Sequence, residues 1–340
     1  MNERILTFAI HQTGNCTAQT DKWSFAFPFP TRLMGVKHSG SNGSKTSTFA
    51  VGGGAVISAT TIANSGNPTY TQPDTEPDYV DAGTAYTLTF AAGTAIDDPM
   101  LIFFFEIGEG GAYAVEPGER VVAIPIYQTG TMATAAYTLE FPMPVKYIGT
   151  YACDSNAGAD TLTLAGGAVQ AATALCTTQD TPAWIPPTTA PDYCAEDTII
   201  TITLTGTTSV DPFVLLFFAL GEGGADWRGM TERTQCVSLI QVGDATTGAW
   251  VYEFPFPVVY RGHKGCASGT STTTITLAGG VVDAAAAIGA SADPVYSQPT
   301  TVPDYCDADT AITITLTQTA TRGDDPLVVS FFDIGEGGLV

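Results

Sequence analysis

The chain has 340 residues, and its 34 acidic side chains against 12 basic ones give a formal net charge of −22. Such acidity argues against direct nucleic-acid binding, which needs Lys and Arg to displace counterions from phosphates. Hydrophobic residues make up 44% of the chain, with 36 Gly and 21 Pro, which is typical of a folded, turn-rich protein and excludes a disordered one.

No apolar stretch approaches the roughly 18 residues of a membrane-spanning helix. The start, MNERILTFAI, lacks the basic region and long apolar run of a secretory signal. We therefore expect synthesis in the cytoplasm and no membrane partner.

The sequence repeats one pattern three times. FAFPFP at 25–30 returns as LEFPMP at 139–144 and YEFPFP at 252–257, and GEGG begins at Gly108, Gly221 and Gly335. The steps are 113 or 114 residues, so three of them account for the whole length. Because a unit of about 110 residues can bury its own core, we expect three domains, at 1–111, 112–226 and 227–340. Short linkers at 111–119 and 224–232 predict a compact or evenly spaced row of domains.

Period-two alternation predicts antiparallel strands within each unit. In the first unit these are 5–11, 23–27, 33–37, 46–51, 86–90 and 100–107, with copies in the other two. Trp23 and Trp250 alternate with smaller residues, which favours core positions over an exposed carbohydrate platform. Helical periodicity is confined to 281–287, where one turn at most is expected. The predicted fold is all-β: three tandem antiparallel β-sandwiches, jelly-roll-like.

The strand that follows each Asp-Pro is apolar on both faces. Such a strand is central in its sheet, or its second face is covered by another unit or by a partner. Adjacent phenylalanines occur in every copy, and we take these as interface candidates: Phe104, Phe105, Phe217, Phe218, Phe331 and Phe332.

An aromatic residue also recurs in the long loop ahead of each Pro-Asp-Tyr. The three residues are Tyr70, Trp184 and Tyr296. If exposed, they would suit a partner or the face of a sugar ring, so they are further interface candidates.

The cysteines give a local prediction. Cys153 and Cys266 occupy one repeat position, where the first unit has a serine, and Cys194 and Cys306 occupy another. Because both positions carry cysteine in units two and three, and neither does in unit one, we predict the bridges Cys153–Cys194 and Cys266–Cys306. Reduced, buried thiols in contact are the alternative for a cytoplasmic product.

Catalytic and metal-binding patterns are not recognisable. The three histidines, His11, His38 and His263, occupy unrelated repeat positions, and no nucleophile–base, zinc or phosphate-loop spacing occurs. Acids that recur in all three units, such as Asp98, would suit calcium, but turn formation explains an aspartate before proline equally well. We assign no catalytic residue, metal or cofactor, and expect no enzyme.

The repeated pattern runs from aromatic-x-FPFP through a strand with Gly35–Lys37 to a closing FF-x-[IL]-GEGG. It resembles the β-sandwich modules of tailed-bacteriophage virion proteins, which occur in capsid decoration proteins and in tail or fibre proteins. The resemblance covers all three units and implies structural or binding modules without catalytic residues. The coiled-coil, collagen-like and triple β-helix repeats of fibre shafts are not found in this sequence.

The resemblance implies a virion structural protein on the particle surface, a capsid decoration or cement protein that binds the major capsid protein or other virion proteins. Three linked domains would also mimic a trimer at a threefold site. Two alternatives stay open: a tail, fibre or cell-surface module that binds glycans, and a filament subunit that self-associates through edge strands.

Overall fold

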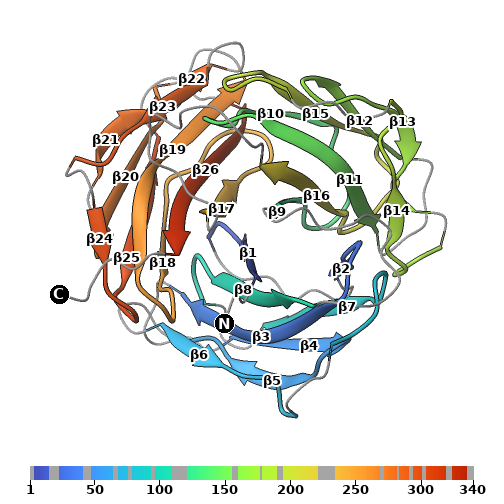
Figure 1. Cartoon of the computed structure of the whole chain (residues 1–340), viewed down its shortest axis with the longest axis horizontal. Coiled ribbons are helices and arrows are strands. Elements are labelled where there is room, and N and C mark those ends of the chain that lie inside the picture. The colour runs from blue at the N-terminus through green and yellow to red at the C-terminus, as the bar shows by residue number, and fades with distance from the viewer. Residues whose placement is uncertain are drawn as a thin grey trace.

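The computed structural model is a ring of three β-sandwiches (Figure 1). It describes residues 4–14, 23–40, 47–63, 68–75, 79–92, 96–108, 121–154, 160–176, 178–189, 194–220, 234–268, 272–281, 283–290, 294–300, 304–318 and 324–334. These residues form 26 strands and no helix. The predicted all-β, jelly-roll-like class is confirmed.

The first unit is a jelly roll made of eight strands. One sheet has the order β1-β8-β3-β6 and the other β2-β7-β4-β5, and every pairing is antiparallel. Successive strands alternate between the two sheets except at the β4–β5 hairpin, which stays within one sheet, as in a jelly roll of two Greek keys. The bounds are β1 (Arg4–His11), β2 (Trp23–Phe25), β3 (Thr31–Ser39), β4 (Ser47–Gly53), β5 (Ile57–Thr61), β6 (Thr69–Thr71), β7 (Tyr86–Ala92) and β8 (Met100–Ile107).

The second unit repeats this topology, with sheets β9-β16-β11-β14 and β10-β15-β12-β13. Its strands are β9 (Val121–Tyr127), β10 (Ala135–Leu139), β11 (Val145–Cys153), β12 (Thr161–Gly166), β13 (Gln170–Ala174), β14 (Ala183–Ile185), β15 (Ile200–Thr205) and β16 (Phe213–Leu220).

The third unit has sheets β17-β26-β19-β22 and β18-β25-β20-β21, and β23 and β24 also pair with β19. Its strands are β17 (Thr234–Ile240), β18 (Gly248–Tyr252), β19 (Val258–Ser268), β20 (Thr274–Gly279), β21 (Asp283–Ala287), β22 (Gly289–Ala290), β23 (Val295–Ser297), β24 (Asp304–Cys306), β25 (Ile312–Thr317) and β26 (Asp324–Ile334).

The two sheets of each unit differ in burial. In the sheet that contains β1, β9 or β17, called here the inner sheet, strands such as β8, β9, β16 and β17 are buried at every residue. In the other, outer sheet, β15 and β25 alternate between buried Ile or Leu and more accessible Thr. A strand that is buried on one face only gives this alternation, and its β-branched residues favour the extended backbone.

The first strands of the three units, β1, β9 and β17, lie around the centre of the ring, near an approximate threefold axis (Figure 1). Cross-unit hydrogen bonds join them. The Gln235 side-chain oxygen accepts from the Thr7 backbone N–H at 2.9 Å, and the Tyr127 hydroxyl accepts from the His11 backbone N–H at 2.6 Å. The chain therefore builds an intramolecular counterpart of a trimer.

The closed ring differs from the expected row of domains. One buried cluster combines Met100, Ile102 and Phe104 of the first unit with the core of the third, so the cores are not separate. The reason is that both faces of the inner sheets are apolar, and closing the ring buries the second face. The proposed domain limits fall within 109–120 and 221–233, outside the described residues.

The single helical turn considered for 281–287 is wrong where the structure describes it. Asp283–Ala287 forms strand β21, which pairs with β20 at the outer edge of its sheet. Four consecutive alanines favour a helix by propensity, but pairing with a neighbouring strand decides the conformation.

Candidate functional site: the junctions between units

The inner-sheet phenylalanines contact two different units. The position occupied by Phe105, Phe218 and Phe332 faces the core of its own unit, where each ring lies 4.5–4.9 Å from a phenylalanine of the Phe-Pro segment. The adjacent position faces a neighbouring unit. Phe104 lies 5.7 Å from Phe256 of the third unit, and Phe217 lies 5.9 Å from Phe29 of the first.

The third junction is built in the same way, since Phe331 lies 6.4 Å from Phe141 of the second unit. All six candidate phenylalanines are at most 1% exposed. Phe104, Phe217 and Phe331 are therefore contacts between units of the same chain, the other three are core residues of their own unit, and a separate protein cannot reach any of the six while the ring is closed.

The loop aromatics pack onto glycines of the neighbouring inner strand. Tyr70, Trp184 and Tyr296 are each half-buried, in the short strands β6, β14 and β23. A Cβ on Gly35, Gly149 or Gly262 would overlap the respective aromatic ring. The Tyr70 hydroxyl also donates to the Met34 carbonyl at 2.9 Å. These side chains cover β-bulges in the inner sheets, so their rings are not an open platform for a sugar.

The two tryptophans proposed as core residues are buried, with exposures of 1% for Trp23 and 0% for Trp250. Each also joins two units. The Trp23 indole N–H donates to the Gln128 carbonyl at 3.2 Å, and the Trp250 indole N–H donates to the Gln12 carbonyl at 3.0 Å.

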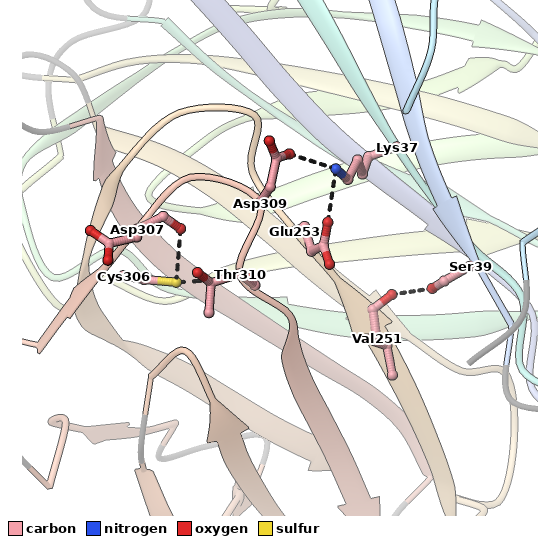
Figure 2. Close-up of polar contacts among 8 residues, drawn as sticks. All are labelled: Lys37, Ser39, Val251, Glu253, Cys306, Asp307, Asp309 and Thr310. Carbon is pink, nitrogen blue, oxygen red and sulfur yellow. Dashed lines mark hydrogen bonds and ion pairs between the residues drawn. The ribbon is translucent and has the colours of Figure 1, made fainter. Parts of the chain in front are cut away.

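A lysine and two carboxylates meet at the junction between the first and third units (Figure 2). Lys37 of β3 places its Nζ 2.8 Å from Glu253 and 2.7 Å from Asp309. Burial lowers the Lys37 pKa, but the hydrogen bonds to Asp309 and Glu253 outweigh it, so the pKa is raised and the amine is charged at neutral pH. Next to it, Ser39 donates to the Val251 carbonyl across the same junction.

The junction between the third and second units uses the same chemistry. Lys264 of β19 binds Glu140 and lies 2.5 Å from Asp197. The Cys266 thiol donates to the Thr138 carbonyl of the second unit at 3.1 Å. Cys266 occupies the repeat position of Ser39, which makes the equivalent bond to Val251. Two of the three junctions thus carry a buried lysine held by two acids.

At one end of the axis, a buried histidine lies where the three units meet. His11 has its Nδ1 2.6 Å from the Tyr127 hydroxyl, and its ring is 4.9 Å from that of Trp250. Burial lowers the His11 pKa to about 3, so the imidazole is neutral at neutral pH.

An Asp–Gly link is repeated next to this end in all three units. Asp98, Asp211 and Asp325 have φ of 45–48°, and each carboxylate accepts from the N–H of the glycine that follows the first strand, at 2.5–2.7 Å. This bond offsets the strain of a left-handed backbone and explains the recurring aspartate before proline. Within the described residues, no group of His, Cys, Asp or Glu converges as a set of metal ligands.

The predicted disulfide bridges are absent from the structure. Cys153, Cys194, Cys266 and Cys306 are all free thiols. Cys306 pairs with Val258 at the start of β19, whereas Cys266 lies eight residues further along the same strand. At about 3.3 Å per residue this separation far exceeds the reach of a disulfide. The paired occurrence of cysteine therefore reflects two separate sites, and Cys194 lies in the same place as Cys306, beside Val145. Cys16 lies outside the described residues.

One backbone N–H of each of the edge strands β5, β13 and β21 is bonded to a side chain from a neighbouring loop. The backbone N–H of Ser58 in β5 donates to Asp74 at 2.9 Å, and that of Ala171 in β13 donates to Thr188 at 2.7 Å. In the third unit the equivalent bond runs from the backbone N–H of Ala284 to the Thr300 hydroxyl. Occupied edge donors resist strand addition, which disfavours a filament built by pairing these edges.

No protein-family model and no curated protein matches the chain. A solved structure described as "The Triple Jelly Roll Fold and Turret Assembly in an Archaeal Virus" is 11% identical, with a TM-score of 0.23, over 96% of this chain and 89% of that one. A second, "Life in the extremes: atomic structure of Sulfolobus Turreted Icosahedral Virus", is 10% identical, with a TM-score of 0.20, over 97% and 91%. Similarity at this level identifies no family, so function is argued from the chain's own geometry.

Strand periodicity alone does not single out the buried lysines Lys37 and Lys264 as functional residues. Lys37, Tyr151 and Lys264 occupy one repeat position. An alignment of the three repeats shows a lysine at this position in units one and three. It also shows a pair of acids, at two other positions, in units two and three. The sequence does not say which unit contacts which, so the pairing needed the ring.

Proposed function

We propose that this chain is a non-enzymatic structural protein of a virion, a single-chain pseudo-trimer that attaches to the outer surface of a capsid as a decoration or cement protein. The observation that carries the proposal is the closed ring of three jelly rolls. Three similar units fixed around one axis present three similar surfaces in the same direction. Such a body can contact three neighbouring capsid subunits at once, and simultaneous contacts raise the overall affinity without any single strong interface.

The surface of the ring is consistent with attachment. The inner sheets are buried in the junctions between units. A capsid would therefore contact the outer sheets, their turns or the ends of the ring. Two matching turns of the outer sheets carry exposed valines, Val56 at 49% and Val169 at 44%. The net charge of −22 keeps free copies from associating with one another before they reach the capsid.

The test is co-sedimentation of the purified chain with expanded, undecorated capsids of the virus that encodes it. We expect saturable binding and a higher disruption temperature of the decorated particles. A variant with Val56→Asp and Val169→Asp should bind more weakly if the outer turns make the contact, and Val242→Asp, at an exposed turn elsewhere (39% exposed), is the matched control. Absence of binding to the capsid would overturn the proposal, and glycan binding in its place would assign the chain to a tail or fibre.

A further inference from the structure

Each junction is built from one position on an inner strand and two positions on the neighbouring unit. The inner-strand position, called here the face position, is Lys37, Tyr151 or Lys264. The two positions on the neighbouring unit, called here the rim pair, are Ala26 and Gly83 in the first unit, Glu140 and Asp197 in the second, and Glu253 and Asp309 in the third.

The observed ring matches every face with a suitable rim. Lys37 of the first unit binds the acidic rim pair of the third, and Lys264 of the third unit binds the acidic rim pair of the second. Tyr151 of the second unit lies against the first unit, where its hydroxyl would be 3.2 Å from a Cβ on Gly83. The first unit, whose rim pair has no acidic residue, is thus contacted by a tyrosine and not by a lysine.

Three units can close into a ring in only one other cyclic order. In that order Lys37 would still meet acids, those of the second unit. Lys264, however, would be buried against Ala26 and Gly83 without a carboxylate, and Tyr151 would be placed against Glu253 and Asp309, which would have lost their lysine. Lys37 and Lys264 are each 5% exposed, and removing one partner of a buried charged pair is strongly destabilising.

The backbone φ angles at one rim position give an independent indication that its aspartates are retained for the contact with lysine. Asp197 and Asp309 both have φ of 55°, and Gly83 has φ of 80° at the same repeat position. Glycine adopts this left-handed conformation without steric cost, whereas aspartate is strained there. The strain is retained only in the two units whose carboxylate binds a lysine of a neighbour.

We propose that the face position and rim pair are the specificity determinants that fix the order of the three units in the ring. The partners they discriminate between are the other two units of the chain. A mismatched junction leaves a face without a suitable rim in its own chain, so the unit can pair with a matching rim of another chain, as in domain swapping. This inference does not depend on the virion role.

The test converts the tyrosine junction into a third lysine junction in the full chain. Tyr151→Lys alone, and Ala26→Glu with Gly83→Asp alone, each create a mismatch. We expect both to melt about 5 °C or more below the unchanged protein and to give dimers and larger oligomers by size-exclusion chromatography with light scattering. The complete set of three substitutions should restore the monomer and most of the melting temperature.

The reverse conversion uses the junction between the third and second units. Lys264→Tyr alone, and Glu140→Ala with Asp197→Gly alone, should each weaken the ring, and together they should restore it. All these substitutions introduce residues that already occupy the same repeat position in another unit. Complete sets no better than either half, in both conversions, would overturn the proposal, as would half-sets that remain monomeric and as stable as the unchanged protein.

Discussion

Acidification is expected to lower the free energy of unfolding through His11. The side chain lies between Tyr127 and Trp250, where three units meet, and is 2% exposed. Its pKa falls from the ordinary value of 6.5 to about 3 because burial disfavours the imidazolium. The unfolded chain therefore takes up a proton near pH 6.5, while the folded ring does not take it up until near pH 3.

The sign and size of the effect follow from linkage. Between pH 6.5 and pH 3 the unfolded state binds more protons than the folded state, so the free energy of unfolding falls as the pH falls. Above pH 6.5 this group has no effect. At pH 5, which is 1.5 units below the ordinary pKa, the loss from His11 is about 2 kcal/mol at about 1.4 kcal/mol per unit.

The assay is chemical denaturation at pH 7.5 and pH 5 of the unchanged protein and of His11→Gln, which is similar in size and does not titrate. The unchanged protein should lose about 2 kcal/mol more than the variant between these two values. His38, whose pKa is lowered to about 4 by burial and by Lys37, loses stability on acidification by the same linkage. The control is therefore His38→Gln against the double variant His11→Gln with His38→Gln, which should still differ by about 2 kcal/mol. Equal losses in the unchanged protein and His11→Gln would refute the reasoning.

Three further outcomes are expected. Phe217→Ala should cost about 3–5 kcal/mol in denaturant unfolding, as a core residue does, because its ring is buried between two units; a loss below about 1 kcal/mol is incompatible with that burial. Gly149→Val should lower the melting temperature far more than Gly130→Ala, since both glycines have positive φ but only at Gly149 would a Cβ meet neighbouring atoms; equal effects would contradict the close packing. Mass spectrometry without reduction should find Cys266 and Cys306 unbridged, and a bridge between them would contradict the register of β19.

The local structure could be predicted from the sequence because it depends on short-range patterns. The apolar run that follows Asp98-Pro99 places the strand Met100–Ile107 with its observed bounds, and the repeat of 113 or 114 residues predicts three like units. The recurrence of an aspartate before proline is also visible in the sequence, whereas its contact with Gly14, 84 residues away, needs the pairing of two strands. The fold class therefore followed from the order of residues alone.

The disulfide prediction shows where pattern alone misleads. Cys266 and Cys306 vary together between units, but strand register separates them by most of β19. Register depends on which strands pair and in which direction, and sequence spacing does not contain that information. The same limit applied to Tyr70, which is next to a glycine of β3 and not exposed in a loop.

By itself, the sequence determined most of the strands and the presence of a second apolar face on each inner sheet, because these depend on the side-chain pattern of single strands, and its repeat determined the triplication. Only the tertiary structure decided what covers that face. Closing the ring places Phe104 on the third unit and Lys37 between Glu253 and Asp309, contacts more than 140 residues apart in the chain. They form because three tethered apolar surfaces bury more area against one another than each could alone, and the charged residues among them allow one order only.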